Sequence, residues 1–203
     1  TGAQIVYVIR VLGGSTQTGA FTRRSASLGD VIICSVKRAM AGGEVKAAVE
    51  AVRGTEARLF INDHWQAAID AGAFGVHLGQ EDMDLANLAA IGAAGMRLGL
   101  SSHGYAEMLR ADALSPSYIA MGAVFPTTLK RMATAAPGPG RLHAYARLLR
   151  NYPLVAIGGI DGGSLPRVLK TGVGSVAVVR AITAAASPEA AAALLLAQFG
   201  AKK

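Results

Sequence analysis

The sequence predicts an α/β fold, a single (β/α)8 TIM barrel over residues 1–203 with an irregular first βα unit. Three observations favour this fold. From residue 57 onward, short β-branched runs alternate with Ala- and Leu-rich stretches of helical period, which is typical of a parallel sheet built from βα units. Two apolar runs upstream bring the predicted strands to eight, at roughly 25 residues per unit. The G-x-G-x-x-G motif of an open doubly wound sheet is absent, so a closed barrel is favoured.

The predicted strands are nearly continuous apolar runs, as expected where helices cover one face of a sheet and a core covers the other. They are residues 4–9, 31–36, 58–61, 74–77, 98–101, 118–122, 154–157 and 175–179. The predicted helices are residues 44–52, 65–71, 84–91, 106–111, 142–149, 165–170 and 188–197. Residues 13–28 lack a helical period, and residues 127–140 contain two prolines, so both segments are expected to form loops.

Composition limits the class of protein. Apolar residues make up 52% of the chain and charged residues 16%, so we expect a sizeable core. Cys34 is the only cysteine, which excludes a disulfide scaffold and favours a reducing compartment. No apolar run approaches the roughly 20 residues of a membrane-spanning helix, and no signal peptide is readable. We therefore expect no membrane partner and a cytoplasmic location.

The chain is basic, with 20 Lys and Arg residues against 13 Asp and Glu residues and a net charge of +7. This charge indicates an anionic partner. The basic residues are scattered, aromatic residues are only 5% of the chain, and no nucleic-acid-binding signature occurs. Small phosphorylated ligands explain the charge equally well, so we expect them as partners and expect no nucleic acid.

In a barrel of this kind, functional residues lie at the C-terminal ends of the strands. Asn62 and Asp63 end the third strand, and Asp82 follows the fourth. Two carboxylates on adjacent strand ends could share one Mg²⁺, because Mg²⁺ needs only one or two protein carboxylates when phosphate oxygens supply the other ligands. The residue types alone favour the alternative that Asp63 and Asp82 cap the helices that follow them, and the two roles do not exclude each other.

Three further positions are candidates for binding an anion. Ser101 and His103 end the fifth strand, where a hydroxyl and an imidazole could contact an anion or move a proton. Lys130 lies in the predicted loop after the sixth strand, as a phosphate-binding cation or simply a solvated side chain. Gly158 and Gly159 follow the seventh strand, at the standard phosphate site of such barrels, although they could merely form a tight turn.

Three other residues are assigned to packing. His77 lies within the fourth strand and is expected to pack or to form an internal hydrogen bond. Cys34 and Trp65 are likewise left to the core.

Six short sequence segments together resemble one known protein family. In order along residues 57–183, FINDHW, GVHLGQED, LGLSSH, YIAMGAVFPTTLK, VAIGGI and TGVGSVAVVRAI resemble the thiamine-phosphate synthase family, which includes the thiazole tautomerases. The resemblance implies a (β/α)8 barrel and a transferase that joins hydroxymethylpyrimidine diphosphate to a thiazole phosphate. The products are thiamine phosphate and pyrophosphate, and electrostatic stabilisation of the departing pyrophosphate dominates.

The resemblance also implies roles for individual residues. Asp63 and Asp82 match the Mg²⁺ ligands, which makes Mg²⁺ the expected cofactor. Pyrophosphate contacts are implied for Lys37, Asn62, Ser101 and Lys130, and Ser101, Lys130 and His103 are the candidate catalytic residues. The thiazole phosphate side is implied for Thr127, Gly158, Gly159, Val179 and Arg180.

The chain departs from the family pattern at several positions. With Lys37 aligned on the Lys of the family's second-strand pattern Q-L-R-x-K, Ile33, Cys34 and Ser35 stand where Gln, Leu and Arg belong. Leu129 replaces a Thr, and Arg180 stands where the eighth strand usually ends in Ser. Loss of one charge-assisted phosphate contact weakens transition-state binding by roughly 10- to 150-fold. One hypothesis is that Arg180 supplies a charge that partly offsets the missing Arg.

Three functions therefore stay open. The leading prediction is a synthase impaired by the departures at Ile33, Ser35 and Leu129. The second is a thiazole tautomerase-like isomerase that uses His103. The third is a non-catalytic barrel that binds a phosphorylated ligand through Gly158 and Gly159. Whether copies associate as a homo-oligomer is not decided by the sequence.

Overall fold

A computed structural model describes residues 6–12, 31–36, 43–55, 57–127, 136–150 and 152–200, with side chains from residue 44 to residue 199 of these ranges. The predicted loop at residues 13–28 lies outside the described residues, as does most of the predicted loop at 127–140. Lys37, Leu129 and Lys130 also lie outside them.

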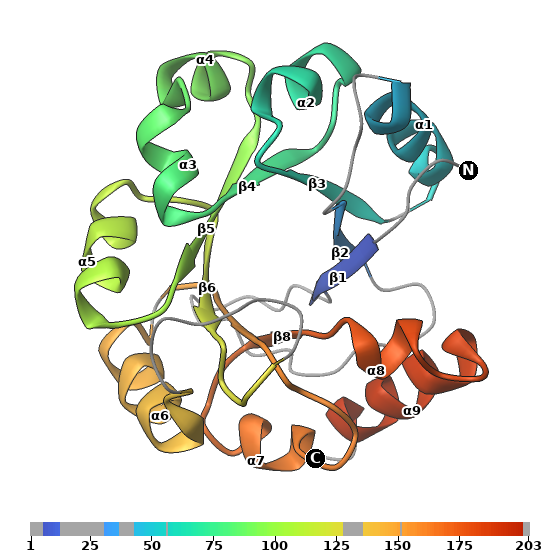
Figure 1. Cartoon of the computed structure of the whole chain (residues 1–203), viewed down its shortest axis with the longest axis vertical. Coiled ribbons are helices and arrows are strands. Elements are labelled where there is room, and N and C mark those ends of the chain that lie inside the picture. Colours follow the sequence, from blue (N-terminus) through green and yellow to red (C-terminus); the bar gives the residue numbers. More distant parts are fainter. Residues whose placement is uncertain are drawn as a thin grey trace, which may run out of the picture.

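The described strands form one curled sheet, and the helices surround it on the outside (Figure 1). The strands follow chain order and are β1 (Val6–Leu12), β2 (Val31–Val36), β3 (Arg58–Asn62), β4 (Gly75–Leu78), β5 (Arg97–Ser102), β6 (Tyr118–Gly122), β7 (Leu154–Ile157) and β8 (Ser175–Ala177). Every pairing from β2 to β8 is parallel, as the prediction of βα units requires. The architecture is that of a TIM barrel.

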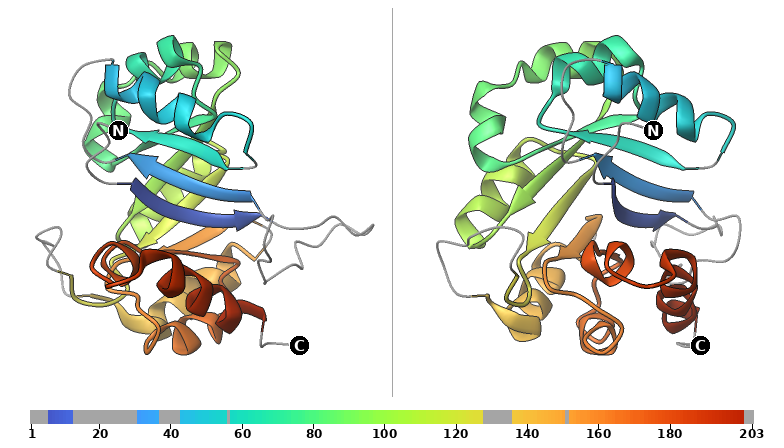
Figure 2. Two further views of the ribbon diagram at one scale, coloured as in Figure 1. Left: turned by 90° about the vertical axis from the view of Figure 1, so that its right-hand side faces the viewer. Right: turned by 45° about the vertical axis from the view of Figure 1, so that its right-hand side comes forward.

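The helices follow the strands and cover the outer face of the sheet, as two further views also show (Figure 2). They are α1 (Gly43–Val52), α2 (Trp65–Ala71), α3 (Gln80–Leu85), α4 (Leu88–Ala93), α5 (Tyr105–Ala113), α6 (Gly138–Leu148), α7 (Leu165–Leu169), α8 (Arg180–Thr183) and α9 (Pro188–Gly200). Within the described ranges, none of these helices has the length and apolar character needed to cross a membrane.

The first unit is irregular, as predicted, but in a specific way. β1 pairs antiparallel with β2, from Val6 opposite Val36 to Leu12 opposite Val31, and the register shifts between Val8 and Arg10. The expectation that the first strand joins the parallel sheet is therefore wrong. A parallel neighbour needs a crossover of a dozen or more residues, usually helical, and the sequence between these strands has no helical period. β1 lies beside β8, and among the described strands no backbone pairing joins the two.

Two predicted segments have different boundaries in the structure. The helix predicted at 84–91 is two short helices, α3 and α4, and the second starts where the Asn87 side chain accepts a hydrogen bond from the Ala90 backbone N–H. α6 begins at Gly138, within the segment predicted as a loop.

Side chains alternate between the two faces of the sheet. One face packs under the helices and contributes Ile61, Val76, Leu100 and Ile119 to the main core. The other face fills the interior of the barrel with a small cluster, Phe60, Tyr118, Ala120, Val155 and Ala177. This alternation follows from the period of two along a strand, and it decides which residues reach the mouth of the barrel.

Two glycines make room for the aromatic side chains inside the barrel. A Cβ atom on Gly99 would lie 2.2 Å from the Tyr118 ring, and one on Gly75 would lie 2.5 Å from the Phe60 ring. The strand neighbours of Phe60 and Tyr118 therefore have to be glycine for both rings to point inward.

Candidate active site

A cavity of about 530 Å³ opens at the C-terminal ends of β5 to β8. Seven of the residues predicted to bind or react with substrate line it: Ser101, His103, Thr127, Gly158, Gly159, Val179 and Arg180. They come from the ends of four strands that are far apart in sequence. The barrel topology brings them together, because the carboxyl ends of parallel strands meet on one rim.

The turn after β7 has the geometry of a backbone cradle. Gly158 and Gly159 have φ values of +95° and +65°, in the region that favours glycine. A Cβ atom on Gly158 would lie 2.4 Å from the Ala123 Cβ, and one on Gly159 would lie 2.6 Å from the Pro126 carbonyl oxygen. Glycine is therefore required at both positions by the tight packing of this turn against residues 123–126, and the role of the pair in binding phosphate stays a prediction.

The same turn ends in a reciprocal pair of hydrogen bonds. The Ser164 backbone N–H donates to Asp161 Oδ1 at 2.8 Å, and the Asp161 backbone N–H donates to Ser164 Oγ at 2.9 Å. Hydrogen bonding by the backbone and then the side chain of Ser164 lowers the pKa of the Asp161 carboxyl. Asp161 lines the cavity and was missed by the sequence analysis, although its place two residues after Gly159 could have marked it.

Asn62 is a buried polar residue at the end of β3. Its side chain is only 3% exposed, and both its Nδ2 and its Oδ1 lack a hydrogen-bond partner. A buried polar group without a partner costs about 1–3 kcal/mol, and native proteins rarely tolerate it without a reason. Asn62 lies opposite His77 in the β3–β4 register, on the face of the sheet that points into the barrel.

Asp63 and Asp82 lie on the same rim, directly after β3 and in the first turn of α3. The alternative that they are helix caps is wrong, because His64 occupies the N-cap of α2, Gly79 that of α3 and Asn87 that of α4. Asp63 has a φ of +65°, which is uncommon for a residue other than glycine and occurs mostly at functional positions.

These two carboxylates suit Mg²⁺ better than a metal bound by protein alone. The described residues contain no cluster of three or more His, Cys, Asp or Glu side chains that could hold an ion. Neither Asp63 nor Asp82 is among the residues that line the cavity. One or two protein carboxylates are enough for Mg²⁺ when phosphate oxygens complete its shell. The donor chemistry therefore fits the predicted ion.

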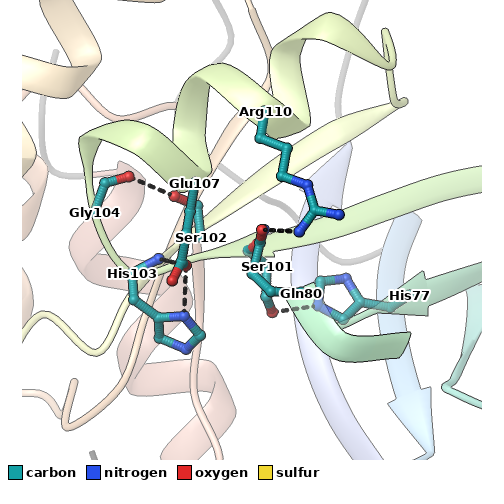
Figure 3. Close-up of polar contacts among 8 residues, drawn as sticks. All are labelled: His77, Gln80, Ser101, Ser102, His103, Gly104, Glu107 and Arg110. Atoms are coloured by element: carbon teal, nitrogen blue, oxygen red, sulfur yellow. Dashed lines mark hydrogen bonds and ion pairs between the residues drawn. The ribbon is translucent and has the colours of Figure 1, made fainter. Parts of the chain in front are cut away.

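His103 lies at the edge of the cavity with a fixed orientation (Figure 3). Its Nδ1 lies 2.8 Å from Glu107 Oε2, and the same carboxylate oxygen accepts the His103 backbone N–H at 2.7 Å. Glu107 belongs to the first turn of α5, so the helix start holds the imidazole in place.

His77 forms internal hydrogen bonds, as predicted. Its Nδ1 lies 2.8 Å from the Tyr118 hydroxyl, and its Nε2 lies 2.8 Å from Ser101 Oγ. Gln80 Nε2 donates to the Ser101 carbonyl oxygen at 2.6 Å (Figure 3). The sequence analysis placed Ser101 in the site but missed Tyr118 and Gln80. Trp65 packs against the main core, as expected.

For the residues of the second strand that depart from the family pattern, the structure describes the backbone only. Ile33, Cys34 and Ser35 of β2 pair in parallel with Arg58, Leu59 and Phe60 of β3. They are therefore adjacent to the strand that carries Asn62 and Asp63. The described residues do not test the roles of Lys37 and Lys130.

Fold and cavity together define a class: a (β/α)8 barrel with a cavity at the C-terminal ends of β5 to β8, lined by a glycine turn after β7. The family model described as thiamine monophosphate synthase matches residues 35–182. The chain belongs to this family, as the resemblance of the six segments predicts.

Individual relatives are similar over most of their length. The thiamine-phosphate synthase of Neisseria meningitidis serogroup A (strain Z2491) is 58% identical over 147 residues, which cover 72% of each chain. That of Yersinia pestis (strain Pestoides F) is 52% identical over 153 residues, covering 75% of this chain and 71% of its own. The solved structure of thiamine phosphate pyrophosphorylase from Pyrococcus furiosus has a TM-score of 0.73 at 29% identity, covering 84% of this chain and 83% of its own.

A second family model, described as ribosomal protein L14p/L23e, matches residues 1–54. This segment contains β1, β2 and the departures at Ile33, Cys34 and Ser35. The part of the chain that carries the cavity is thus similar to one family, and its N-terminal quarter is also similar to another.

Proposed function

We propose that the chain catalyses the synthase reaction, transferring the hydroxymethylpyrimidine group from its diphosphate to a thiazole phosphate. The bond between the pyrimidine methylene carbon and the diphosphate oxygen breaks, and the thiazole nitrogen forms the new bond to that carbon. The products are thiamine phosphate and pyrophosphate. The observation that carries this proposal is the convergence of seven predicted substrate residues on one cavity.

The thiazole phosphate is assigned to the cradle after β7. Gly158 and Gly159 both line the cavity, and their positive φ values give a turn whose backbone N–H groups would hold phosphate oxygens. Arg180 starts α8 and lines the same cavity, where its charge favours a dianion. This position supports the hypothesis that Arg180 offsets an arginine lost elsewhere.

The diphosphate is assigned to the part of the rim formed by β3, β4 and β5. The buried Asn62 amide and the Ser101 hydroxyl bind and orient its oxygens, and Asp63 and Asp82 would hold Mg²⁺ beside it. When bound, Mg²⁺ supplies positive charge that stabilises the negative charge on the leaving pyrophosphate.

A second function is favoured by one observation. The His103 imidazole is oriented by Glu107 at the edge of the cavity, an arrangement suited to moving a proton on a bound thiazole phosphate. This arrangement supports a tautomerase-like isomerisation as the alternative.

The proposal is tested by incubating the purified chain with both phosphorylated precursors, with Mg²⁺ and with a chelator, and measuring thiamine phosphate. We expect Mg²⁺-dependent product at a reduced rate, and a further loss of about 10- to 150-fold in Asp63→Ala. Product that forms equally well in the chelator or in Asp63→Ala would contradict the metal assignment. Isomerised thiazole without thiamine phosphate would favour the tautomerase.

The remaining expectations stay predictions. We propose small phosphorylated partners, no nucleic acid and a cytoplasmic location, in line with the biosynthetic family to which the chain belongs. The oligomeric state is a separate question, which sedimentation would answer.

A further inference from the structure

Three polar side chains form a continuous hydrogen-bonded row inside the barrel, across the neighbouring strands β6, β4 and β5. The Tyr118 hydroxyl lies 2.8 Å from His77 Nδ1, and His77 Nε2 lies 2.8 Å from Ser101 Oγ. Tyr118 is 1% exposed and His77 is 5% exposed, whereas Ser101 lines the cavity. The row therefore begins in the buried core and ends at the surface that substrate would contact.

The direction of these hydrogen bonds follows from the chemistry of the groups. A neutral imidazole carries one N–H donor and one acceptor nitrogen. A phenol is a stronger donor than an aliphatic alcohol, which favours the arrangement in which the Tyr118 O–H donates to Nδ1 and the imidazole proton sits on Nε2. The Nε2–H then donates to Ser101 Oγ. The Ser101 hydroxyl hydrogen is left to point elsewhere, and the cavity is on its open side.

Several contacts hold the row in place. The His77 and Tyr118 rings stack with centroids 5.5 Å apart and an angle of 16° between their planes. Gly99 leaves the space that the Tyr118 ring occupies. Gln80 anchors the Ser101 backbone by donating to its carbonyl oxygen at 2.6 Å (Figure 3). The position of Ser101 Oγ is therefore held by His77 and Gln80.

We propose that His77 and Tyr118 are positioning residues that commit Ser101 to donate its hydroxyl hydrogen to an anionic phosphate oxygen. The inference rests on the proposed function in taking that anion to be the diphosphate group. A fixed donor favours an anion because its hydroxyl needs no reorientation when charge develops. If the polarity of the row were reversed, Ser101 would offer a lone pair to the anion and repel it.

The test measures binding of inorganic pyrophosphate, with Mg²⁺ present, by calorimetry on the full chain. Tyr118→Phe removes one oxygen and with it the group that sets the tautomer, and we expect affinity to fall about 3- to 10-fold. Tyr152→Phe is the matched control. Tyr152 lies just before β7, outside the row, and its hydroxyl also donates to a buried acceptor, the Pro116 carbonyl oxygen. It should change stability but leave pyrophosphate affinity within twofold.

A double-mutant cycle separates positioning from packing. His77→Leu and Ser101→Ala should each weaken binding, and the double variant should bind no worse than Ser101→Ala, because His77 acts through Ser101. His77→Gln keeps one acceptor and one donor and should recover at least half of the lost binding free energy. Additive losses in the cycle, or unchanged affinity in Tyr118→Phe, would overturn the inference.

The readout is independent of turnover. If the wild-type protein binds pyrophosphate but makes no thiamine phosphate, the proposed function is wrong. The binding measurements then still test the roles of His77 and Tyr118. A wild-type chain that binds no pyrophosphate would overturn the inference itself. If His77→Leu does not fold, as judged by a cooperative melt, Tyr118→Phe and its Tyr152→Phe control still decide the matter.

Discussion

Asn62 and Asn87 show how one residue type serves two opposite purposes. The Asn87 side chain is exposed and caps α4 by accepting a hydrogen bond at 3.0 Å from the Ala90 N–H. The Asn62 side chain is buried and has no partner for either polar atom. The first asparagine therefore stabilises the fold, and the second costs stability, which a role in binding the diphosphate, as proposed above, would explain.

This contrast gives a prediction at the residue scale. Asn62→Leu, which keeps the branching and the number of side-chain heavy atoms, should raise the free energy of unfolding by about 1–3 kcal/mol because no buried amide is left unpaired. The same variant should lose affinity for pyrophosphate. Asn87→Ala should lower the free energy of unfolding by about 1 kcal/mol and leave the affinity unchanged. Chemical denaturation and calorimetry measure both effects, and a destabilised Asn62→Leu would count against the assignment.

Sequence reasoning predicted many single residues of the rim because their positions follow from topology. Ser101, Thr127 and Gly159 line the cavity as expected once each is placed at a strand end. The cap interpretation of Asp63 and Asp82 was wrong, since N-cap preference does not show which residue of a polar turn takes the cap. The partnership of His77 with Tyr118 was not predictable, because it joins residues 41 positions apart.

At the scale of elements, two glycines in the turn after β7 differ in the space around their Cα atoms. Gly159 has a φ of +65° and no room for a Cβ, whereas Gly162 lies in the same turn with only Gln198 Nε2, 3.5 Å away, near its Cβ position. The two glycines therefore differ in what an added methyl group would meet.

Gly159→Ala should lower affinity for the thiazole phosphate at least tenfold, because the backbone must move away from Pro126 and the cradle opens. Gly162→Ala should bind the same ligand within twofold of the wild type. Titration of each variant with the thiazole phosphate measures this difference. Equal affinities for both variants would show that the cradle does not hold the phosphate.

Elements were predicted well wherever a strand is a continuous apolar run. The parallel strands β3 to β8 fall close to their predicted positions, because burial on both faces requires such runs. The prediction of one helix at 84–91 was wrong. The helical period of this Ala-rich stretch continues through residues 86 and 87, whereas in the structure Asn87 is the N-cap of a second helix. The boundary between α3 and α4 is set by helix capping, and a hydrophobic period does not reveal where a cap lies.

At the scale of the whole molecule, the N-terminal quarter of the chain differs from the rest in the family that it resembles. Residues 35–182 match the thiamine monophosphate synthase family, and residues 1–54 match a ribosomal protein family. The antiparallel β1 and the absent Q-L-R-x-K pattern both fall in the second match. The prediction of one domain over residues 1–203 stays a prediction, and the departures at Ile33, Cys34 and Ser35 from the family pattern lie in its N-terminal quarter.

The central claim is that the rim of β3 to β8 carries working synthase machinery. The most direct test replaces residues 1–54 by the corresponding segment of the Neisseria meningitidis enzyme, which is 58% identical to this chain over 147 residues. We expect the hybrid to form thiamine phosphate from the two precursors at least tenfold faster than the natural chain, because the missing second-strand contacts are restored. A hybrid that melts cooperatively yet forms no thiamine phosphate, while the Neisseria enzyme does so in parallel, would contradict the claim.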